Sequence, residues 1–245
     1  MTTVAVIPAR YGSTRFPGKP LALIAGKPMI QWTYEKAAAS KVDRVIVATD
    51  DEKIFACVTE FGGEVVMTRS DHPTGTDRIA EAVKDIDCDL IINLQGDEPL
   101  LPTEVIDELV DRMIKSPQVN MGTVAVRKSF DSEEYTNPNN VKVVLDKQQQ
   151  ALYFSRCSMP FSRNQPEEGD SIYLHWGIYA YRRQLLFDFI TWPQGTLEKI
   201  ESLEQLRVLE HGEKILVAIS DRESVGVDTP EDVAKVEQLL KDQSQ

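Results

Sequence analysis

Short apolar runs rich in β-branched residues alternate with stretches of helical spacing through the first half of the chain. This alternation limits the possible folds more than any other feature of the sequence. The runs occupy residues 3–7, 44–48, 64–67 and 89–94, and apolar residues recur at helical spacing over residues 28–40, 51–61, 76–85 and 102–114. Strands and helices in this order predict an α/β fold with a mostly parallel central sheet and helices on both of its faces.

The pattern changes from about residue 121. Two short strands at 141–145 and 151–154, separated by a polar turn, predict a hairpin. A strand at 172–181, a helix through 198–210 that opens near Thr196, and a strand at 214–219 follow. The last helix should begin at Pro230, behind Thr229 as its N-cap. Because no long linker is present, we expect a single domain, residues 1–245, with a hairpin-rich subregion at about 121–182.

The charge balance excludes several classes of partner. The 245 residues include 27 Lys plus Arg and 39 Asp plus Glu, which gives a net charge of −12. Such a chain should repel nucleic acids and anionic membranes. Three widely spaced cysteines suit a reducing cytoplasm, and neither a signal peptide nor a membrane-spanning apolar run is readable. Residues 1–40 nevertheless contain five cations against one acidic residue, so positive charge is concentrated there.

The first candidate motif covers residues 8–20, directly after the first strand. Gly12 and Gly18 let the backbone approach a ligand, and Arg10, Arg15 and Lys19 can surround several phosphates. The spacing differs from a Walker loop, and the residue after the lysine is a proline. A polyphosphate site is predicted, although an exposed polar turn would also explain these residues.

Two further motifs carry carboxylates. Asp97 follows the strand at 89–94 and could bind a magnesium ion, with Gln95 beside it as a polar contact for a substrate. A plain strand-to-helix turn fits the same residues. Asp228 precedes the last helix, where a capping or dipole-complementing role is the common one. Spacing alone leaves open whether Asp97 and Asp228 meet.

The remaining polar candidates are weaker individually. Residues 74–78 fit either a ligand-contacting turn or an ordinary helix start. His175 is typical of a partly buried histidine on a strand. Arg156 is a candidate anion-binding residue if it faces a cleft. Glu204 and Gln205 could simply belong to one face of a helix. With three histidines in the chain, neither a Ser-His-Asp triad nor a histidine-rich metal site is readable.

Taken together, these motifs resemble the 3-deoxy-manno-octulosonate cytidylyltransferase family, the CMP-Kdo synthetases. The matching segments, in chain order, are 8–20, 48–50, 75–78, 95–99, 151–156, 204–207 and 227–232. The match as a whole runs in order from residue 4 to about residue 240. An ordered match over nearly the whole chain is far more specific than any single motif.

The resemblance implies a nucleotide-diphospho-sugar transferase fold that is Rossmann-like, with CTP and Kdo as substrates and Mg²⁺ as cofactor. It also implies formation of CMP-Kdo and pyrophosphate for lipopolysaccharide synthesis, a cytoplasmic location and a homodimer, to which the hairpin-rich subregion could contribute. Carried over position by position, the nucleotide-binding residues are Arg10, Gly12, Ser13, Arg15, Lys19 and Thr76. The sugar-binding residues are Arg78, Gln95, Arg156, His175, Tyr179, Glu204 and Gln205. Asp97 and Asp228 would bind the metal and, with Lys19, form the catalytic group.

Three departures from the family pattern concern the sugar side. Thr74 stands where many members have Ser, and Leu174 and Trp176 flank His175 where a basic residue and a small aliphatic are frequent. The fine recognition of the sugar, including an 8-amino Kdo analogue, therefore stays open. Three separate alternatives are another acidic sugar such as a sialate, a different nucleotidyl donor, and a catalytically silent nucleotide-binding protein. The expected reaction is in-line attack of the sugar's anomeric hydroxyl on the α-phosphorus of CTP.

Overall fold

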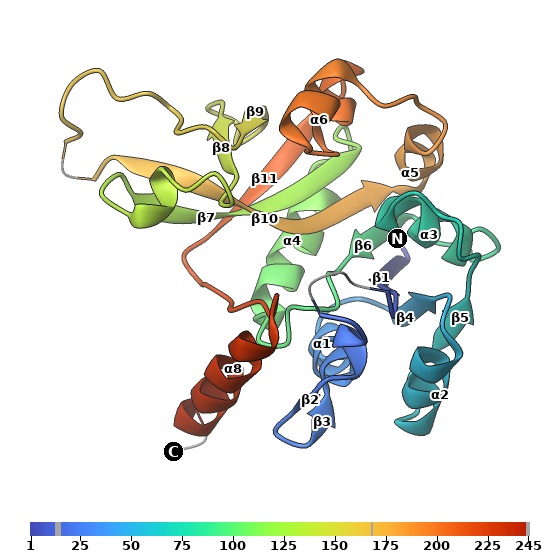
Figure 1. Cartoon of the computed structure of the whole chain (residues 1–245). Coiled ribbons are helices and arrows are strands. Elements are labelled where there is room, and N and C mark those ends of the chain that lie inside the picture. Colours follow the sequence, from blue (N-terminus) through green and yellow to red (C-terminus); the bar gives the residue numbers. More distant parts are fainter. Residues whose placement is uncertain (13–15, 168, 244–245) are drawn as a thin grey trace. The chain divides into compact units, whose positions relative to one another are not determined.

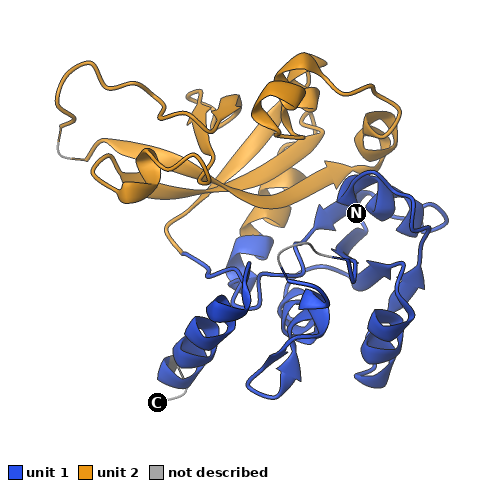
Figure 2. Cartoon of the chain, in the orientation of Figure 1, with its two compact units in different colours: residues 1–107, 223–245 blue, residues 108–222 orange. Residues whose placement is uncertain are grey.

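The computed structural model describes residues 1–12, 16–167 and 169–243 (Figure 1). Two compact units make up the chain (Figure 2). The first unit combines Met1–Asp107 with Glu223–Gln245, and the second is Glu108–Arg222. The expectation that residues 1–245 form one domain stays a prediction, and each unit is described by itself.

Four parallel strands form the sheet of the first unit, in the spatial order β6, β1, β4, β5. They are β1 (Thr3–Ala9), β4 (Arg44–Thr49), β5 (Val65–Met67) and β6 (Leu90–Asn93), and every pairing among them is parallel. Residues 4–7 of the central strand β1 are completely buried, as expected for a strand covered on both faces. The predicted parallel α/β sheet is confirmed.

Helices α1 (Met29–Ala38), α2 (Glu52–Glu60) and α3 (Gly75–Ala82) pack against these strands. The Asp51 side chain caps α2 by accepting hydrogen bonds from two backbone N–H groups. The Thr74 side chain caps α3 by accepting a hydrogen bond from one backbone N–H group. Both predicted helix starts thus follow from local capping.

One part of the first unit was not predicted from the sequence. A 3₁₀ turn, Lys19–Leu21, leads into a small hairpin of β2 (Leu23–Ile24) and β3 (Lys27–Pro28). Helix α8 (Pro230–Gln243) contacts this hairpin. Its start at Pro230 is as predicted. The C-terminal segment is thereby packed onto residues from the beginning of the chain.

The second unit is built on antiparallel pairs. Strand β7 (Met121–Ser129) pairs antiparallel with β10 (Ser171–Arg182) and parallel with β11 (Ile215–Ser220). The predicted hairpin is present as β8 (Lys142–Leu145) and β9 (Ala151–Ser155). Strand β7 was not predicted from the sequence.

The prediction of a single helix through residues 198–210 is wrong. The structure has α6 (Thr196–Glu201) and α7 (Leu206–Glu210), with Ser202 in the left-handed region at φ 53°. A left-handed residue ends the first helix, so residues 202–205 form a turn between the two. A further helix, α5 (Arg183–Phe189), follows β10 and was also missed.

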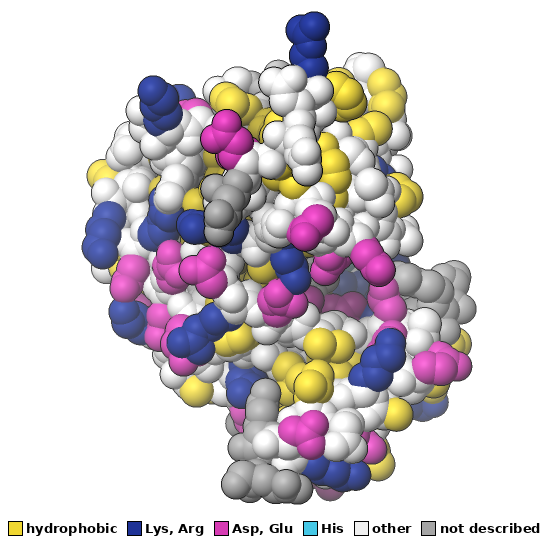
Figure 3. All heavy atoms as spheres, turned by 90° about the vertical axis from the view of Figure 1, so that its left-hand side faces the viewer, with side chains coloured by type: hydrophobic (Ala, Val, Ile, Leu, Met, Phe, Trp, Pro, Cys, Tyr) yellow, Lys and Arg dark blue, Asp and Glu magenta, His cyan; other side chains and the backbone are white. Residues whose placement is uncertain are grey.

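Helix α4 (Thr103–Lys115) begins in the first unit and ends in the second, and a 3₁₀ turn covers Glu133–Tyr135. Each helix within the described residues is too short or too polar to span a bilayer. On the face drawn in Figure 3, acidic and basic side chains are interspersed, so on that face the excess negative charge is not gathered into one patch.

Candidate active site

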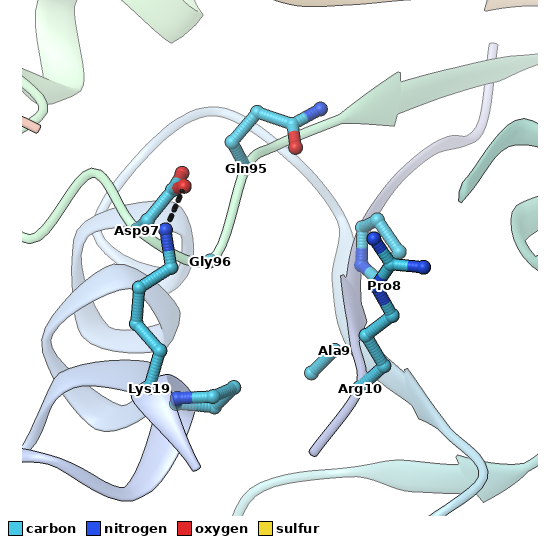
Figure 4. Close-up of a pocket in the computed structure, with 8 residues that line it drawn as sticks. Pro8, Ala9, Arg10, Lys19, Gln95, Gly96 and Asp97 are labelled. Carbon is cyan, nitrogen blue, oxygen red and sulfur yellow. Dashed lines mark hydrogen bonds and ion pairs between the residues drawn. The ribbon is translucent and has the colours of Figure 1, made fainter. Parts of the chain in front are cut away.

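A pocket of about 240 Å³ lies in the first unit, where strands β1 and β6 end (Figure 4). The residues that line it come from the two motifs predicted to follow these strands: Pro8, Ala9, Arg10, Lys19, Pro20, Gln95, Gly96 and Asp97. Because β1 and β6 are neighbouring parallel strands, their carboxyl ends meet at one edge of the sheet. The pocket therefore forms where ligands bind in α/β sheets.

The loop after β1 turns back toward the pocket at Gly18. This residue has a φ of 72°, and its N–H donates to the Tyr11 carbonyl at 2.9 Å. A Cβ at this position would lie 3.2 Å from the Tyr11 ring and would hold a backbone conformation that L residues rarely adopt. Glycine is thus needed to bring Lys19 to the pocket. Ser13 and Arg15, two predicted nucleotide-binding residues, lie outside the described residues.

Lys19, Asp97 and Asp228, here called the Lys19 cluster, come together although they lie far apart in the sequence. The Lys19 ammonium is 2.6 Å from an Asp97 carboxylate oxygen and 3.6 Å from one of Asp228. It also donates to the carbonyl oxygen of Val227 at 2.9 Å. The question left open by the sequence is answered, since both carboxylates face the same cation.

Packing and hydrogen bonds hold Asp228 in this position. The N–H of Val227 donates to the Asp97 carbonyl at 2.9 Å, and the Val227 side chain is buried with Ile24, Met29 and Val236. On the other side of Asp228, the Asp232 carboxylate accepts from the backbone N–H groups of Asp228 and Thr229. These bonds, that of Thr229 above all, lower the pKa of Asp232 to about 2.

The other predicted residues of this unit take different positions. Arg10 is exposed and lies across the pocket from Lys19 (Figure 4). Gln95 lines the pocket and donates to the Asn93 side chain at 3.4 Å. Gly12 is exposed in the loop, whereas Thr76 is buried in the first turn of α3. Arg10 and Gln95 are thus placed at the pocket with the Lys19 cluster.

Arg78 is buried and already has an acidic partner. Its guanidinium lies 3.2 Å from the Asp50 carboxylate and donates to the Thr68 hydroxyl at 2.5 Å. The charge of Arg78 is therefore largely balanced within the protein. A guanidinium carries five N–H donors, more than these two contacts use.

The Lys19 cluster fits a magnesium ion in its donor chemistry. Magnesium prefers oxygen ligands and is usually held by one or two carboxylates together with substrate phosphates, without an all-protein cage. Asp97 and Asp228 supply two carboxylates that already face a cation. Within the described residues there is no group of three or more His, Cys, Asp or Glu that could hold a metal.

Four predicted sugar-binding residues lie together in the second unit, although strand β10 and the α6–α7 turn are distant in sequence. The Tyr179 hydroxyl donates to Oε1 of Gln205 at 3.2 Å, and the rings of His175 and Tyr179 are 5.4 Å apart. Burial lowers the pKa of His175 to about 3. Burial and, second, the nearby Glu204 carboxylate raise the pKa of Tyr179. Both rings are thus neutral at physiological pH.

Arg156 is fixed against the end of helix α6, directly before the same α6–α7 turn. Its Nε donates to the Glu201 carbonyl at 2.9 Å and its Nη1 to the Pro138 carbonyl at 3.1 Å. The Glu201 carboxylate accepts from the Arg156 backbone N–H and from the Ser155 hydroxyl. The guanidinium is therefore held by neutral carbonyl groups, unlike that of Arg78.

Sequence reasoning missed two buried residues around these groups. Lys142 is completely buried, and its ammonium donates to the carbonyls of Asn137, Asn140 and Arg156 at 2.6–2.9 Å. Thr123, also completely buried, bonds to His175. Each was visible as a single polar residue in an apolar run, at 141–145 and 121–126. A single polar residue in an apolar run indicates a buried hydrogen bond, because a buried polar group needs a partner.

Comparison with known proteins agrees with this architecture. A family model described as cytidylyltransferase matches residues 4–215. The chain belongs to the cytidylyltransferase family. Its relatives include the 3-deoxy-manno-octulosonate cytidylyltransferase of Thermodesulfovibrio yellowstonii, 51% identical over 98% of both chains. The enzyme of that name from Bdellovibrio bacteriovorus is 51% identical over 99% of both chains. The family resemblance of the sequence motifs is confirmed.

Solved structures of cytidylyltransferases share the fold. A CMP:2-keto-3-deoxy-manno-octonic acid synthetase complexed with CTP superposes with a TM-score of 0.94 at 43% identity, covering 99% of this chain and 100% of that one. The 4-diphosphocytidyl-2C-methyl-D-erythritol synthase of Anaerococcus prevotii is 16% identical with a TM-score of 0.66, covering 98% and 96%. The latter likeness concerns the fold alone.

Proposed function

We propose that this member of the family transfers CMP from CTP to 3-deoxy-D-manno-octulosonate (Kdo), releasing pyrophosphate. Support comes from relatives of that name at about half identity over the full chain and from the relative solved with CTP. Within this chain, the observation that carries the proposal is the convergence of Asp97 and Asp228 on the Lys19 ammonium. A plain nucleotide-binding protein has no need for two carboxylates beside a phosphate-binding cation.

The reaction exchanges one phosphorus–oxygen bond for another. The anomeric hydroxyl oxygen of Kdo attacks the α-phosphorus of CTP, and the bond to the bridging oxygen of the β-phosphate breaks. The hydroxyl proton is lost to solvent or to the departing pyrophosphate. Negative charge therefore accumulates on the leaving group, and the protein must neutralise it.

The cations of the first unit suit this task. Lys19 and Arg10 lie on two sides of the pocket and would contact the triphosphate, together with Arg15. Asp97 and Asp228 would hold Mg²⁺, which when bound lowers the pKa of the attacking hydroxyl and shares the charge on the phosphates. In this scheme the Lys19 ammonium leaves its carboxylate partners for the phosphates when the nucleotide binds.

The second substrate is itself an anion, and its carboxylate needs a cation. Of the two predicted arginines, Arg156 is held by carbonyl groups, whereas Arg78 is paired with Asp50. An arginine without a bound carboxylate attracts a substrate carboxylate more strongly. We therefore assign the charge contact to Arg156, and hydroxyl recognition to Arg78, Gln95, His175, Tyr179, Glu204 and Gln205.

The family resemblance also motivates three broader proposals. The product would serve lipopolysaccharide synthesis, the reaction would take place in the cytoplasm, and the enzyme would act as a homodimer. Analytical ultracentrifugation of the purified chain tests the last of these, because a single species at the monomer mass would contradict it.

Pyrophosphate release tests the function directly. We expect release with CTP, magnesium and Kdo together, and none when any one of them is omitted. A panel that includes 8-amino-Kdo, a sialate, UTP and ATP distinguishes neighbouring specificities. A folded protein that binds CTP but releases no pyrophosphate with any sugar would instead be a silent nucleotide-binding protein.

A further inference from the structure

The pairing of β7 and β10 is irregular next to Thr123. The register shifts between Trp176 and Tyr179 of β10, so residues 177 and 178 have no partner in β7. Bulges of this kind commonly redirect side chains near functional sites. The Thr123 hydroxyl oxygen lies beneath the irregularity, 2.7 Å from the carbonyl oxygen of Ile178 and 3.3 Å from that of Trp176.

The same hydroxyl oxygen is 3.0 Å from Nε2 of His175. A threonine hydroxyl has one hydrogen to donate, and a carbonyl oxygen only accepts. The short distance to Ile178 assigns the hydrogen to that carbonyl. Toward His175 the hydroxyl is consequently an acceptor, and Nε2 must carry a proton.

The other ring nitrogen of His175 then has the opposite character. Burial keeps the ring neutral, with its pKa lowered to about 3, and a neutral imidazole protonated at Nε2 has a lone pair at Nδ1. The Phe154 ring, in a T-shaped contact with a centroid distance of 5.0 Å, and the Tyr179 ring, with a centroid distance of 5.4 Å, fix the ring plane. The orientation of an acceptor at Nδ1 is therefore fixed by packing.

Tyr179, the neighbour of the His175 ring, is in turn hydrogen-bonded to a residue that carries an amide donor. Gln205 is 3% exposed, and its Oε1 accepts from the Tyr179 hydroxyl. Its buried Nε2 makes no hydrogen bond within the described part of the chain. A buried amide donor without a partner is costly and points to a ligand as the missing acceptor. The acceptor on His175 and the donor on Gln205 each suit a sugar hydroxyl, because a hydroxyl both donates and accepts.

We propose that Thr123 is a positioning residue that fixes His175 as the Nε2-protonated tautomer, so that Nδ1 accepts a hydrogen bond from a hydroxyl of the sugar substrate. Thr123, His175, Tyr179 and Gln205 are called the His175 cluster below. The substrate part of this inference rests on the proposed function. The tautomer part does not, because it concerns the protein without substrate.

Nitrogen-15 NMR of the histidine side chains tests the tautomer. The chain has three histidines, so a His175→Gln variant identifies the signal. In the wild-type protein we expect a protonated Nε2 and an unprotonated Nδ1 for His175 between pH 6 and 8. In Thr123→Val, which has no acceptor, we expect a mixture of tautomers, and in Thr123→Ser the wild-type pattern.

Steady-state kinetics test the consequence for substrate. We expect Thr123→Val to raise KM for Kdo about 5- to 10-fold, the value of one ordinary hydrogen bond, with KM for CTP unchanged and rescue by Thr123→Ser. Thr123→Cys nearly keeps the side-chain volume but offers a weaker acceptor. It replaces the valine variant in both experiments if that variant fails to fold.

Three outcomes overturn the proposal. A wild-type His175 protonated at Nδ1 refutes the role of Thr123 even in an active enzyme. A valine variant with the wild-type tautomer and unchanged KM for Kdo refutes it as well. The expected tautomer in a protein that transfers CMP to no sugar overturns the proposed function and the substrate part of this inference, while leaving the tautomer assignment intact.

Discussion

The Lys19 cluster of the first unit and the His175 cluster of the second present opposite kinds of polar group. In the first, Asp97 and Asp228 are 34% and 55% exposed, and they surround an ammonium. In the second, Thr123 and Gln205 are 0% and 3% exposed, and all four groups are neutral. Burying a charge costs far more than burying a hydrogen-bonded neutral group.

The difference indicates two modes of recognition. Charged groups that keep contact with water can exchange partners, as Lys19 must when phosphates enter. Buried neutral groups have fixed directions and can distinguish the hydroxyl pattern of a sugar. We therefore expect variants of the first cluster to affect CTP and the chemical step, and variants of the second to affect the sugar alone.

The largest effect should come from Asp97→Asn. The amide keeps the shape of the side chain but removes the charge that would bind the metal, so we expect kcat for pyrophosphate release to fall about 100-fold or more. The melting temperature should change little. Asp85→Asn, at an exposed carboxylate of the same unit, is the matched control. Near-normal turnover by Asp97→Asn would refute the metal-binding role.

Lys19→Met comes next. Loss of a charge-assisted contact to the triphosphate should raise KM for CTP about 10-fold or more, since such contacts contribute roughly 1.5–3 kcal/mol. KM for Kdo should stay within twofold. Lys241→Met, an exposed lysine of α8, controls for the change in net charge. An equal rise in both KM values would remove the contrast between the clusters.

Tyr179→Phe should give the converse result. Removing the hydroxyl that donates to Gln205 at 3.2 Å leaves a buried amide oxygen without its donor. We expect KM for Kdo to rise about fivefold, the scale of one neutral hydrogen bond, with KM for CTP unchanged. Tyr173→Phe on the same strand is the control. The comparison fails if Tyr179→Phe alters CTP binding instead.

The last effect concerns stability at low pH and not turnover. The folded pKa of His175 is lowered to about 3, against about 6.5 in the unfolded chain. Between these values only the unfolded chain binds the proton, so the free energy of unfolding falls as pH falls from 6.5 toward 3. His175→Gln lacks this contribution. Between pH 6.5 and 5 the wild type should lose roughly 1–2 kcal/mol more than the variant, measured by urea unfolding.

That pH experiment also sharpens the comparison. If wild type and His175→Gln lose stability in parallel between pH 6.5 and 5, His175 is not held neutral, and the second cluster contains a titrating cation after all.

Much of the first unit could be predicted because its signals are local. Strand β1 and the caps Asp51 and Thr74 are readable from a few neighbouring residues. The sequence placed one candidate motif directly after the strand at 3–7 and another after the strand at 89–94, and ligands bind at the carboxyl ends of such strands. In the structure, Arg10, Lys19 and Asp97 from these two motifs line one pocket.

What escaped prediction depends on long-range packing or on single residues. Asp228 meets Asp97 through long-range contacts: Val227 packs with Ile24 and Val236, and its N–H donates to the Asp97 carbonyl. No spacing rule shows such contacts. Helix α6 ends because Ser202 adopts the left-handed backbone conformation. Serine, unlike glycine, does not signal that conformation in a sequence. The pairing of Arg78 with Asp50 joins two motifs that the sequence presented as independent.

The composition of the first unit from residues 1–107 and 223–245 has a consequence for biosynthesis. A ribosome releases the chain from its N-terminus, so the whole second unit emerges before Asp228 does. Until then the newborn protein has Lys19 and Asp97 but lacks the second carboxylate. The catalytic cluster is thus assembled last, and a nascent chain stalled at residue 222 would lack it.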